Sequence, residues 1–193
     1  TVDIAIVLGV DTRKANQTVR AVQDLPHGSG KKVRVGVFAK NDDVESVKSM
    51  GWGDNVIVGS DDLVKRIQGG EVNFDRCVAT PDCMPLVGRV ARILGPRGLM
   101  PNPKLGTVTK DIIGAIKSAL AGQIQFKADK FGMVHCPVGK VSFSEDALAE
   151  NIRALMIGIS NAKPEASKGK YIRKVHLSST MGSGIPVDLT TVD

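Results

Sequence analysis

The chain has 193 residues with a formal net charge of +6, and 4% of its residues are aromatic. This length is enough for one large or two small domains with a buried core. Its three cysteines do not make a disulfide framework, which favours a reducing compartment, and no apolar run approaches the roughly 20 residues of a membrane span. Scarce aromatics argue against single-strand binding by base stacking. The positive surplus is compatible with nucleic acid, and also with a soluble protein that is merely basic.

The first half of the chain is predicted to alternate strands and helices. Apolar and β-branched runs predict strands at residues 1–9, 33–39, 55–59 and 74–80. Helices are predicted at residues 16–25, 41–51, 61–68 and 81–94, the third capped by Ser60 and the fourth opening at Pro81. From residue 33 on, this alternation is typical of a parallel, three-layer α/β unit.

A proline-rich loop follows. Residues 93–104, ILGPRGLMPNPK, combine three prolines, two glycines and two cations. Proline fixes φ and restricts the residue before it, so this segment is predicted to be rigid. Residues 83–110 contain no acid, and their cations are Arg89, Arg92, Arg97, Lys104 and Lys110. An ordered, acid-free loop suggests an anionic ligand, and RNA is the first candidate.

The pattern changes in the last part of the chain. Thr109 is predicted to cap a helix that Gly122 ends. Residues 123–128 and 133–138 are predicted to form an antiparallel hairpin that turns at residues 129–132. A long helix capped by Ser144 follows, with an apolar stripe at residues 147, 148, 152, 155, 156 and 159. Residues 170–179 and 185–189 are two further predicted strands.

The order of these elements predicts two domains. The first 27 residues cannot form a core alone, and the C-terminal elements have room for another strand. We therefore expect a discontinuous α+β domain from residues 1–27 and 122–193, with a Rossmann-like parallel α/β domain inserted at residues 28–121. The chain passes between the two expected domains twice, each time at a glycine-rich segment, and this would allow hinge motion between the domains.

Catalytic and metal chemistry finds little support in the sequence. The segment HGSGKK, residues 27–32, lacks the phosphate-loop spacing and precedes a strand instead of following one. Cys77 and Cys83 are not a C-x-x-C pair, and three scattered histidines give no hydrolase constellation. A nucleotide-binding α/β enzyme remains the rival class. A protein-docking role for the basic face beside the proline-rich loop is a third possibility.

A second basic segment lies near the end of the chain. Residues 163–182 carry five cations against the single acid Glu165 and end in hydroxyl residues and a glycine. One interpretation is a solvated loop and an ordinary edge strand. The other is a phosphate-binding strand followed by a turn, where Ser179 and Thr180 offer hydroxyls and Gly182 lets RNA approach.

Six segments carry a family resemblance. They are VRAVQDLPHGSGK (19–31), FDRCVATPD (74–82), GRVARILGPRGLMPNPKLGTV (88–108), HCPVGKVSF (135–143), ENIRAL (150–155) and SSTMG (178–182). Together they resemble the bacterial or organellar ribosomal protein L-one family, which forms the mobile large-subunit stalk beside the tRNA exit site. The resemblance covers essentially the whole chain. The family's N-terminal arm and first helix are missing, so we expect an N-terminal truncation.

The resemblance implies a non-enzymatic protein without cofactor, metal or membrane contact, monomeric when free, in the cytoplasm or an organellar matrix. The implied partners are large-subunit ribosomal RNA, the protein's own mRNA, whose translation it would repress, and the exit-site tRNA, whose release it would help.

The resemblance also implies the RNA-binding residues. The turn Thr180-Met181-Gly182 is the expected centre of the contact. The same surface is expected to include Thr1, Asp129, Lys130, Ser142, Arg173, Lys174 and Ser179. The cations Arg89, Arg92, Arg97 and Lys104 are expected to form a secondary basic surface. The absent arm would remove some contacts that the family normally brings.

Overall fold

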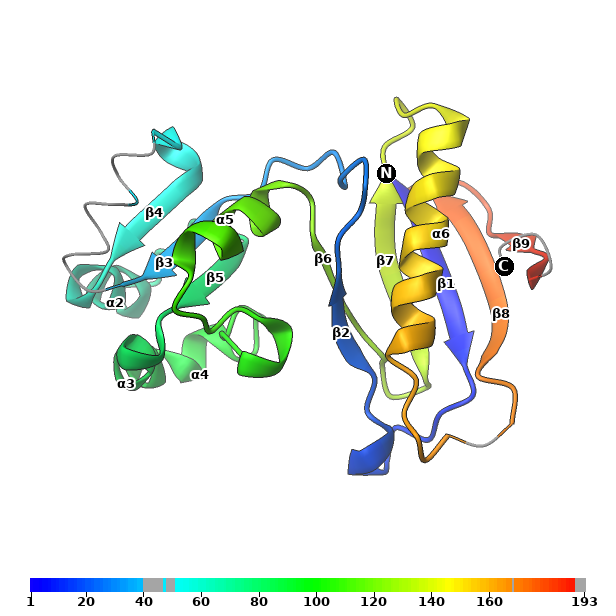
Figure 1. Ribbon diagram of the computed structural model, residues 1–193, viewed down its shortest axis with the longest axis horizontal. Helices are drawn as coiled ribbons and strands as arrows, with labels where there is room; N and C mark the ends of the chain where they lie inside the picture. The colour runs from blue at the N-terminus through cyan, green and yellow to red at the C-terminus, as the bar shows by residue number, and fades with distance from the viewer. Residues whose placement is uncertain (40–46, 48–50, 168, 190–193) are drawn as a thin grey trace. The chain divides into compact units, whose positions relative to one another are not determined.

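The computed structural model describes residues 1–39, 47, 51–167 and 169–189 (Figure 1). The helix expected at residues 41–51 falls mainly outside these described residues. Contacts divide the chain into two compact units: unit 1 comprises Thr1–Lys31 and Ala121–Asp193, and unit 2 comprises Lys32–Leu120. Unit 1 is α+β and unit 2 is parallel α/β, which confirms the expected fold class.

Unit 1 is built on a four-stranded antiparallel sheet with the order β7-β1-β8-β9. The first strand, β1 (Val2–Leu8), lies between β7 (Met133–Gly139) and β8 (Ile172–Ser179). The short strand β9 (Ile185–Val187) pairs with β8 at the edge. The predicted strands at residues 1–9, 133–138, 170–179 and 185–189 are therefore confirmed within a few residues.

One face of this sheet packs on the long helix α6 (Glu145–Asn161), which runs along the strands in Figure 1. The Ser144 hydroxyl accepts a hydrogen bond from the Ala147 amide at 3.3 Å, which confirms the predicted cap. Residues of alternating position on β1 and β7 fill the core with α6, because successive strand side chains point to opposite faces. The core includes Ile4, Ile6, Leu8, Val134, Cys136, Val138, Leu155 and Ile159.

The helix predicted at residues 16–25 is wrong. This segment forms a 3₁₀ turn, η1 (Ala15–Gln17), and then the strand β2 (Arg20–Gln23), which pairs antiparallel with β6 (Ile124–Lys127). Val19, 1% exposed, anchors the strand in the core, and its carbonyl accepts the Ala128 amide at 2.9 Å. A pairing partner distant in sequence has overridden weak helical propensity.

The predicted hairpin at residues 123–138 is only partly right. The turn at residues 129–132 is present, but β6 pairs with β2 and β7 pairs with β1. Only Ala128 and Val134 bridge the two strands directly. The strands separate beyond the turn because each has a better partner in a different sheet.

A buried asparagine on α6 links the helix to the segment after β2 and to strand β7. The Asn151 side chain, 0% exposed, donates hydrogen bonds to the Gly28 carbonyl at 3.0 Å and to the Val138 carbonyl at 2.8 Å. Its oxygen accepts the His27 amide at 3.1 Å. Beside it, the His27 ring lies 2.6 Å from the Glu150 carboxylate. The sequence stripe missed this residue because an asparagine is not counted as core.

Unit 2 is a three-layer α/β structure. The parallel sheet has the order β4-β3-β5, with β3 (Val35–Phe38) between β4 (Val56–Gly59) and β5 (Arg76–Ala79). One hydrophobic cluster joins the sheet to α2 (Asp61–Gln68), α3 (Met84–Arg89) and α4 (Ala91–Leu94). A second cluster joins it to α5 (Ile112–Leu120). Short 3₁₀ turns lie at Gly53–Asn55 (η2), Pro81–Cys83 (η3) and Pro103–Leu105 (η4).

Three local predictions in unit 2 need correction. The single helix expected at residues 81–94 is broken into η3, α3 and α4, and Val90 at the last break has non-helical backbone angles. Thr109 does not cap α5: the Asp111 carboxylate accepts the Gly114 amide at 2.9 Å, while the Thr109 hydroxyl accepts the Asp111 amide. Helix α2 has the predicted bounds, but the Ser60 side chain makes no cap hydrogen bond.

Replacing Asn151 by alanine should lower the free energy of unfolding of unit 1 by about 2–5 kcal/mol, because it leaves buried backbone groups without partners. Urea denaturation followed by circular dichroism measures this change. Asn161→Ala, at the exposed end of the same helix, is the matched control and should stay within about 0.5 kcal/mol of the parent. Equal stabilities of the two variants would contradict the role of Asn151.

Candidate nucleic-acid interface

The sheet of unit 1 has one face that no helix covers among the described residues of the unit. On this face, the residues of β1 that point away from α6 lie beside residues of the two neighbouring strands, β7 and β8. Ala5, for example, lies opposite His135 on β7 and His176 on β8. Asp3 lies opposite Pro137 and Ser178 in the same way. We call this surface the open face. It consists of Asp3, Ala5, Val7, Met133, His135, Pro137, Lys174, His176 and Ser178.

At one end of the open face, two threonines lie side by side. The Thr180 amide donates to the Thr1 carbonyl at 3.2 Å, and the two hydroxyl oxygens are 2.8 Å apart. The Thr1 hydroxyl also donates to the Asp3 carboxylate at 2.9 Å. Thr1 and Thr180 come from opposite parts of the sequence, and the pairing of β1 with β8 brings them together.

The residues after Thr180 form a tight, exposed turn. The Gly182 amide donates to the Ser179 carbonyl at 3.1 Å, and Met181 is 97% exposed. A Cβ at Gly182 would lie close to the Ser179 hydroxyl, which is the mobile end of a short side chain. The turn itself therefore does not require glycine, and the approach of RNA stays the predicted reason for it.

Ser142 lies at the same end of the sheet. Gly139, the last residue of β7, is opposite Val2, and a turn closed by the bond from the Phe143 amide to the Lys140 carbonyl follows it. Ser142 is exposed in this turn. We call this region the hydroxyl end. It comprises Thr1, Ser142, Ser179, Thr180, Met181 and Gly182.

The other expected contact residues lie at the opposite end of the sheet. Lys174 pairs with Val7 at the far end of β1, and Arg173 lies at the register shift beside it. Asp129 and Lys130 form the turn before β7, next to the same end of β1. The seven residues of β1 separate the two ends by about 20 Å. The residues expected on one surface therefore form two groups, at opposite ends of the same sheet.

We call this opposite region the basic end. Its cations are Arg13, Lys14, Arg20, Lys127, Lys130, Lys170, Arg173 and Lys174. Two hollows connect them: one of about 560 Å³ is lined by Lys127 and Lys130, and one of about 440 Å³ by Lys14 and Arg173. Two acids lie nearby: Asp129 accepts backbone amides of its own turn, and Asp11, which lines the second hollow, accepts the Arg13 amide. Positive charge thus gathers away from the hydroxyl end.

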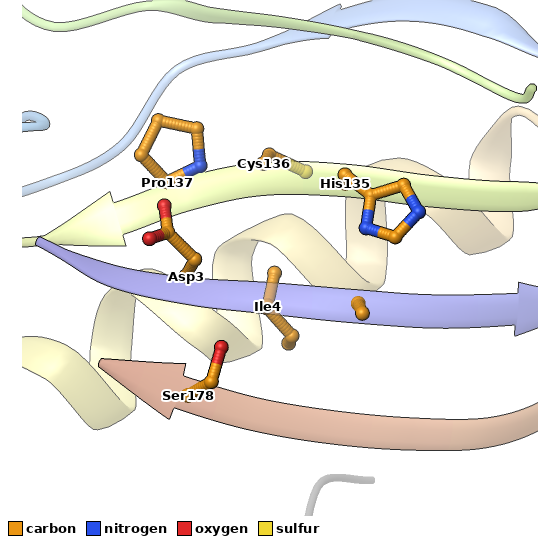
Figure 2. Close-up of a pocket in the computed structure, with 7 residues that line it drawn as sticks. Asp3, Ile4, His135, Cys136, Pro137 and Ser178 are labelled. Carbon is orange, nitrogen blue, oxygen red and sulfur yellow. The ribbon is translucent and has the colours of Figure 1, made fainter. Parts of the chain in front are cut away.

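A shallow hollow of about 330 Å³ lies on the open face beside the hydroxyl end (Figure 2). It is lined by Asp3, Ile4, Ala5, His135, Cys136, Pro137 and Ser178. The hollow exists because Ala5 is small between larger neighbours. Asp3, His135 and Ser178 were not among the expected contact residues, although the alternation of β1 already separates Asp3 from the buried Ile4 and Ile6.

One residue that lines the hollow, Cys136, has a strongly shifted pKa. Burial, and then the negative charge of Asp3, raise the pKa of the Cys136 thiol to about 12. Cys136 is therefore a neutral thiol at physiological pH and a poor nucleophile.

The secondary basic residues lie in unit 2. Arg89, Arg92 and Arg97 are exposed, and Lys104 lies in η4. Arg89 is 3.7 Å from Asp61 of α2, so its charge is partly balanced by an acid outside the acid-free stretch. An exposed pair of this kind adds little to stability.

The proline-rich loop in unit 2 is ordered, as its composition predicts. The Thr107 hydroxyl accepts the Asn102 amide at 2.7 Å and donates to the Asn102 carbonyl at 3.1 Å, and Leu105 is buried. These contacts fix the loop internally, and they give its conformation a structural reason that does not depend on a ligand.

The described residues, 1–39, 47, 51–167 and 169–189, also bear on metal binding and on membrane insertion. Within these ranges, histidine, cysteine, aspartate and glutamate side chains form no group of three or more that could hold a metal ion. Across the same residues, every helix is too short or too polar to span a membrane.

Comparison with known proteins gives a consistent result. Residues 1–183 match the model of the Ribosomal protein L1p/L10e family. Proteins named "Large ribosomal subunit protein uL1" from Coxiella burnetii strains Dugway 5J108-111, RSA 331 / Henzerling II and RSA 493 / Nine Mile phase I are each 54% identical over 191 residues. These matches cover 99% of this chain and 81% of each relative. The chain therefore belongs to the Ribosomal protein L1p/L10e family.

Proposed function

We propose that this protein is a non-enzymatic constituent of the large ribosomal subunit and binds ribosomal RNA through the open face and hydroxyl end of unit 1. The observation that carries this proposal is the contact between Thr1 and Thr180 beside the exposed Met181, at the end of an uncovered sheet face. The similarity to proteins named as large-subunit components supports the assignment to that subunit.

The chemistry of the hydroxyl end suits RNA. Threonine and serine hydroxyls and exposed turn backbone can both donate to and accept from 2′-hydroxyls and base edges, which is how proteins distinguish RNA from DNA. The Asp3 carboxylate would accept hydrogen bonds and repel phosphate, so it would favour a 2′-hydroxyl or a base N–H. The hydroxyl end is thus suited to recognition, while the basic end supplies attraction to phosphates.

The basic end supports a second partner. Its cations lie about 20 Å from the hydroxyl end, so an RNA held there need not be the one held by Thr180. We assign this end to transient contact with exit-site tRNA, whose release it would assist. An mRNA element with the shape of the ribosomal site would compete for the hydroxyl end, and this competition would allow repression of the protein's own synthesis.

Binding to a helix–loop fragment of large-subunit ribosomal RNA should weaken with salt. About five phosphate contacts give a slope of log K against log salt on the order of −4 to −5. Fluorescence anisotropy at several salt concentrations measures the slope, and Lys174→Gln should reduce its magnitude by about one. A flat salt response would contradict the electrostatic part of the proposal.

Thr180→Val should weaken binding to the same fragment by about 1–3 kcal/mol, because a buried RNA group loses its partner. Thr180→Ser keeps the hydroxyl and should bind almost as tightly as the parent. Ser160→Ala, which removes an exposed hydroxyl from α6, is the control for hydroxyl loss elsewhere. If Thr180→Val binds like the parent while remaining folded, the turn is not the contact.

Asp3→Asn separates hydrogen bonding from charge. Removing a negative charge strengthens RNA binding if only long-range electrostatics matter. If the carboxylate accepts hydrogen bonds from RNA, the variant instead binds about 5- to 20-fold more weakly, because charge-assisted bonds are the stronger ones. We expect the weaker binding. Glu165→Gln, an exposed site with the same change of charge, is the control and should bind equally or more tightly.

A further inference from the structure

One aromatic side chain of this protein is fully presented to solvent. Phe131, at the turn between β6 and β7, is 81% exposed. Every other aromatic side chain that the structure describes is buried or half-buried: Phe38, Trp52, Phe74, Phe126, Phe143 and Tyr171. An exposed phenyl ring gains nothing from burial in the fold, so the reason for its position lies outside the unit's own core.

The turn that carries Phe131 is rigid. The Asp129 carboxylate accepts the Phe131 amide and the Met133 amide, both at 2.8 Å. The Asp129 amide donates to the Met133 carbonyl at 2.8 Å, and the Gly132 amide donates to the Asp129 carbonyl at 3.2 Å. The backbone on both sides of Phe131 is therefore fixed before any partner binds, and little backbone entropy is lost on binding.

The turn is also held against the end of β1. Gly132 is buried at φ +76°, where a Cβ would lie 3.1 Å from the Val10 carbonyl oxygen. Its carbonyl accepts the Leu8 amide at 2.8 Å, and the Thr12 hydroxyl donates to the Lys130 carbonyl at 2.8 Å. These contacts keep the turn, and the ring on it, at the surface.

The residues around the turn indicate which class of macromolecule Phe131 would contact. The hollow of about 560 Å³ at the turn is lined by Thr12, Thr18, Lys127, Ala128, Asp129 and Lys130. Arg20 lies opposite Lys127 in the neighbouring strand. Lysine is depleted at the cores of protein–protein interfaces, whereas an aromatic platform with cations on its flanks is the arrangement that binds bases and their phosphates.

We propose that Phe131 is a stacking platform for a nucleobase of RNA, either an unpaired base or the outer face of a terminal base pair. In this arrangement Lys127 and Lys130 contact the flanking phosphates. The inference rests on the proposed function, in that RNA is the ligand of this protein. It adds a base contact at the basic end, through the most exposed of the aromatic side chains that the structure describes.

A tryptophan in place of Phe131 reports the stacking directly. The full chain carrying Phe131→Trp is titrated with unfractionated deacylated tRNA and, separately, with the ribosomal helix–loop fragment. Stacking on a base should quench the fluorescence of the new tryptophan with at least one of these RNAs. Ile157→Trp, on the exposed side of α6, has the same Trp52 background and should show no quenching beyond that of the parent.

Affinity measurements with Phe131→Leu test the energetic part. Leucine keeps an apolar side chain but lacks an aromatic face, so this variant should bind the RNA that quenches Phe131→Trp about fivefold or more weakly, while Phe131→Trp retains the parent's affinity. Absence of quenching, or a leucine variant that binds both RNAs like the parent, overturns the proposal. The proposed function survives that result if Thr180→Val still weakens binding of the ribosomal fragment; absence of RNA binding by the parent overturns both.

Discussion

The structure of unit 1 depends on the insertion of β1 between β7 and β8. Residues 2–8 pair with residues 133–139 on one side and residues 172–179 on the other. This double pairing buries Ile4, Ile6 and Leu8 against α6 and turns Asp3, Ala5 and Val7 to the open face. A shift of one residue would exchange the two sets. Burial of the isoleucines and leucine thus fixes the register that also places Thr1 beside Thr180 and Lys174 beside Val7.

The same register separates recognition from attraction. The hydroxyl end offers neutral groups that test hydrogen-bonding geometry, whereas the basic end concentrates cations that act over longer distances. Under the proposed function, hydroxyls, turn backbone and the Asp3 carboxylate would supply most of the specificity for RNA, because the chain has few aromatic residues. Charge at the far end can then raise the association rate without relaxing this selection.

Much of the fold was predictable from local pattern, and much of the site was not. Strand β1 follows from the alternation of its residues. The bounds of α2 follow from the two acids in its first turn, and the start of α6 follows from the capping residue Ser144. The helix prediction for residues 16–25 failed because this segment contains β2, which is stabilised by pairing with β6 about a hundred residues later. Individual candidates such as Thr180 and Lys130 could be named, but their distribution over two ends depends on strand register, which the local pattern does not contain.

The central position of β1 also orders events during synthesis. Unit 2, residues 32–120, is continuous and has its whole core available once those residues have left the ribosome. The strand β1 is made before unit 2, yet its partners β7 and β8 appear more than a hundred residues later. We therefore expect unit 2 to fold while both edges of β1 are still unpaired. Completion of unit 1 should be the slow step, because pairing β1 with such distant strands closes the longest loop in the chain.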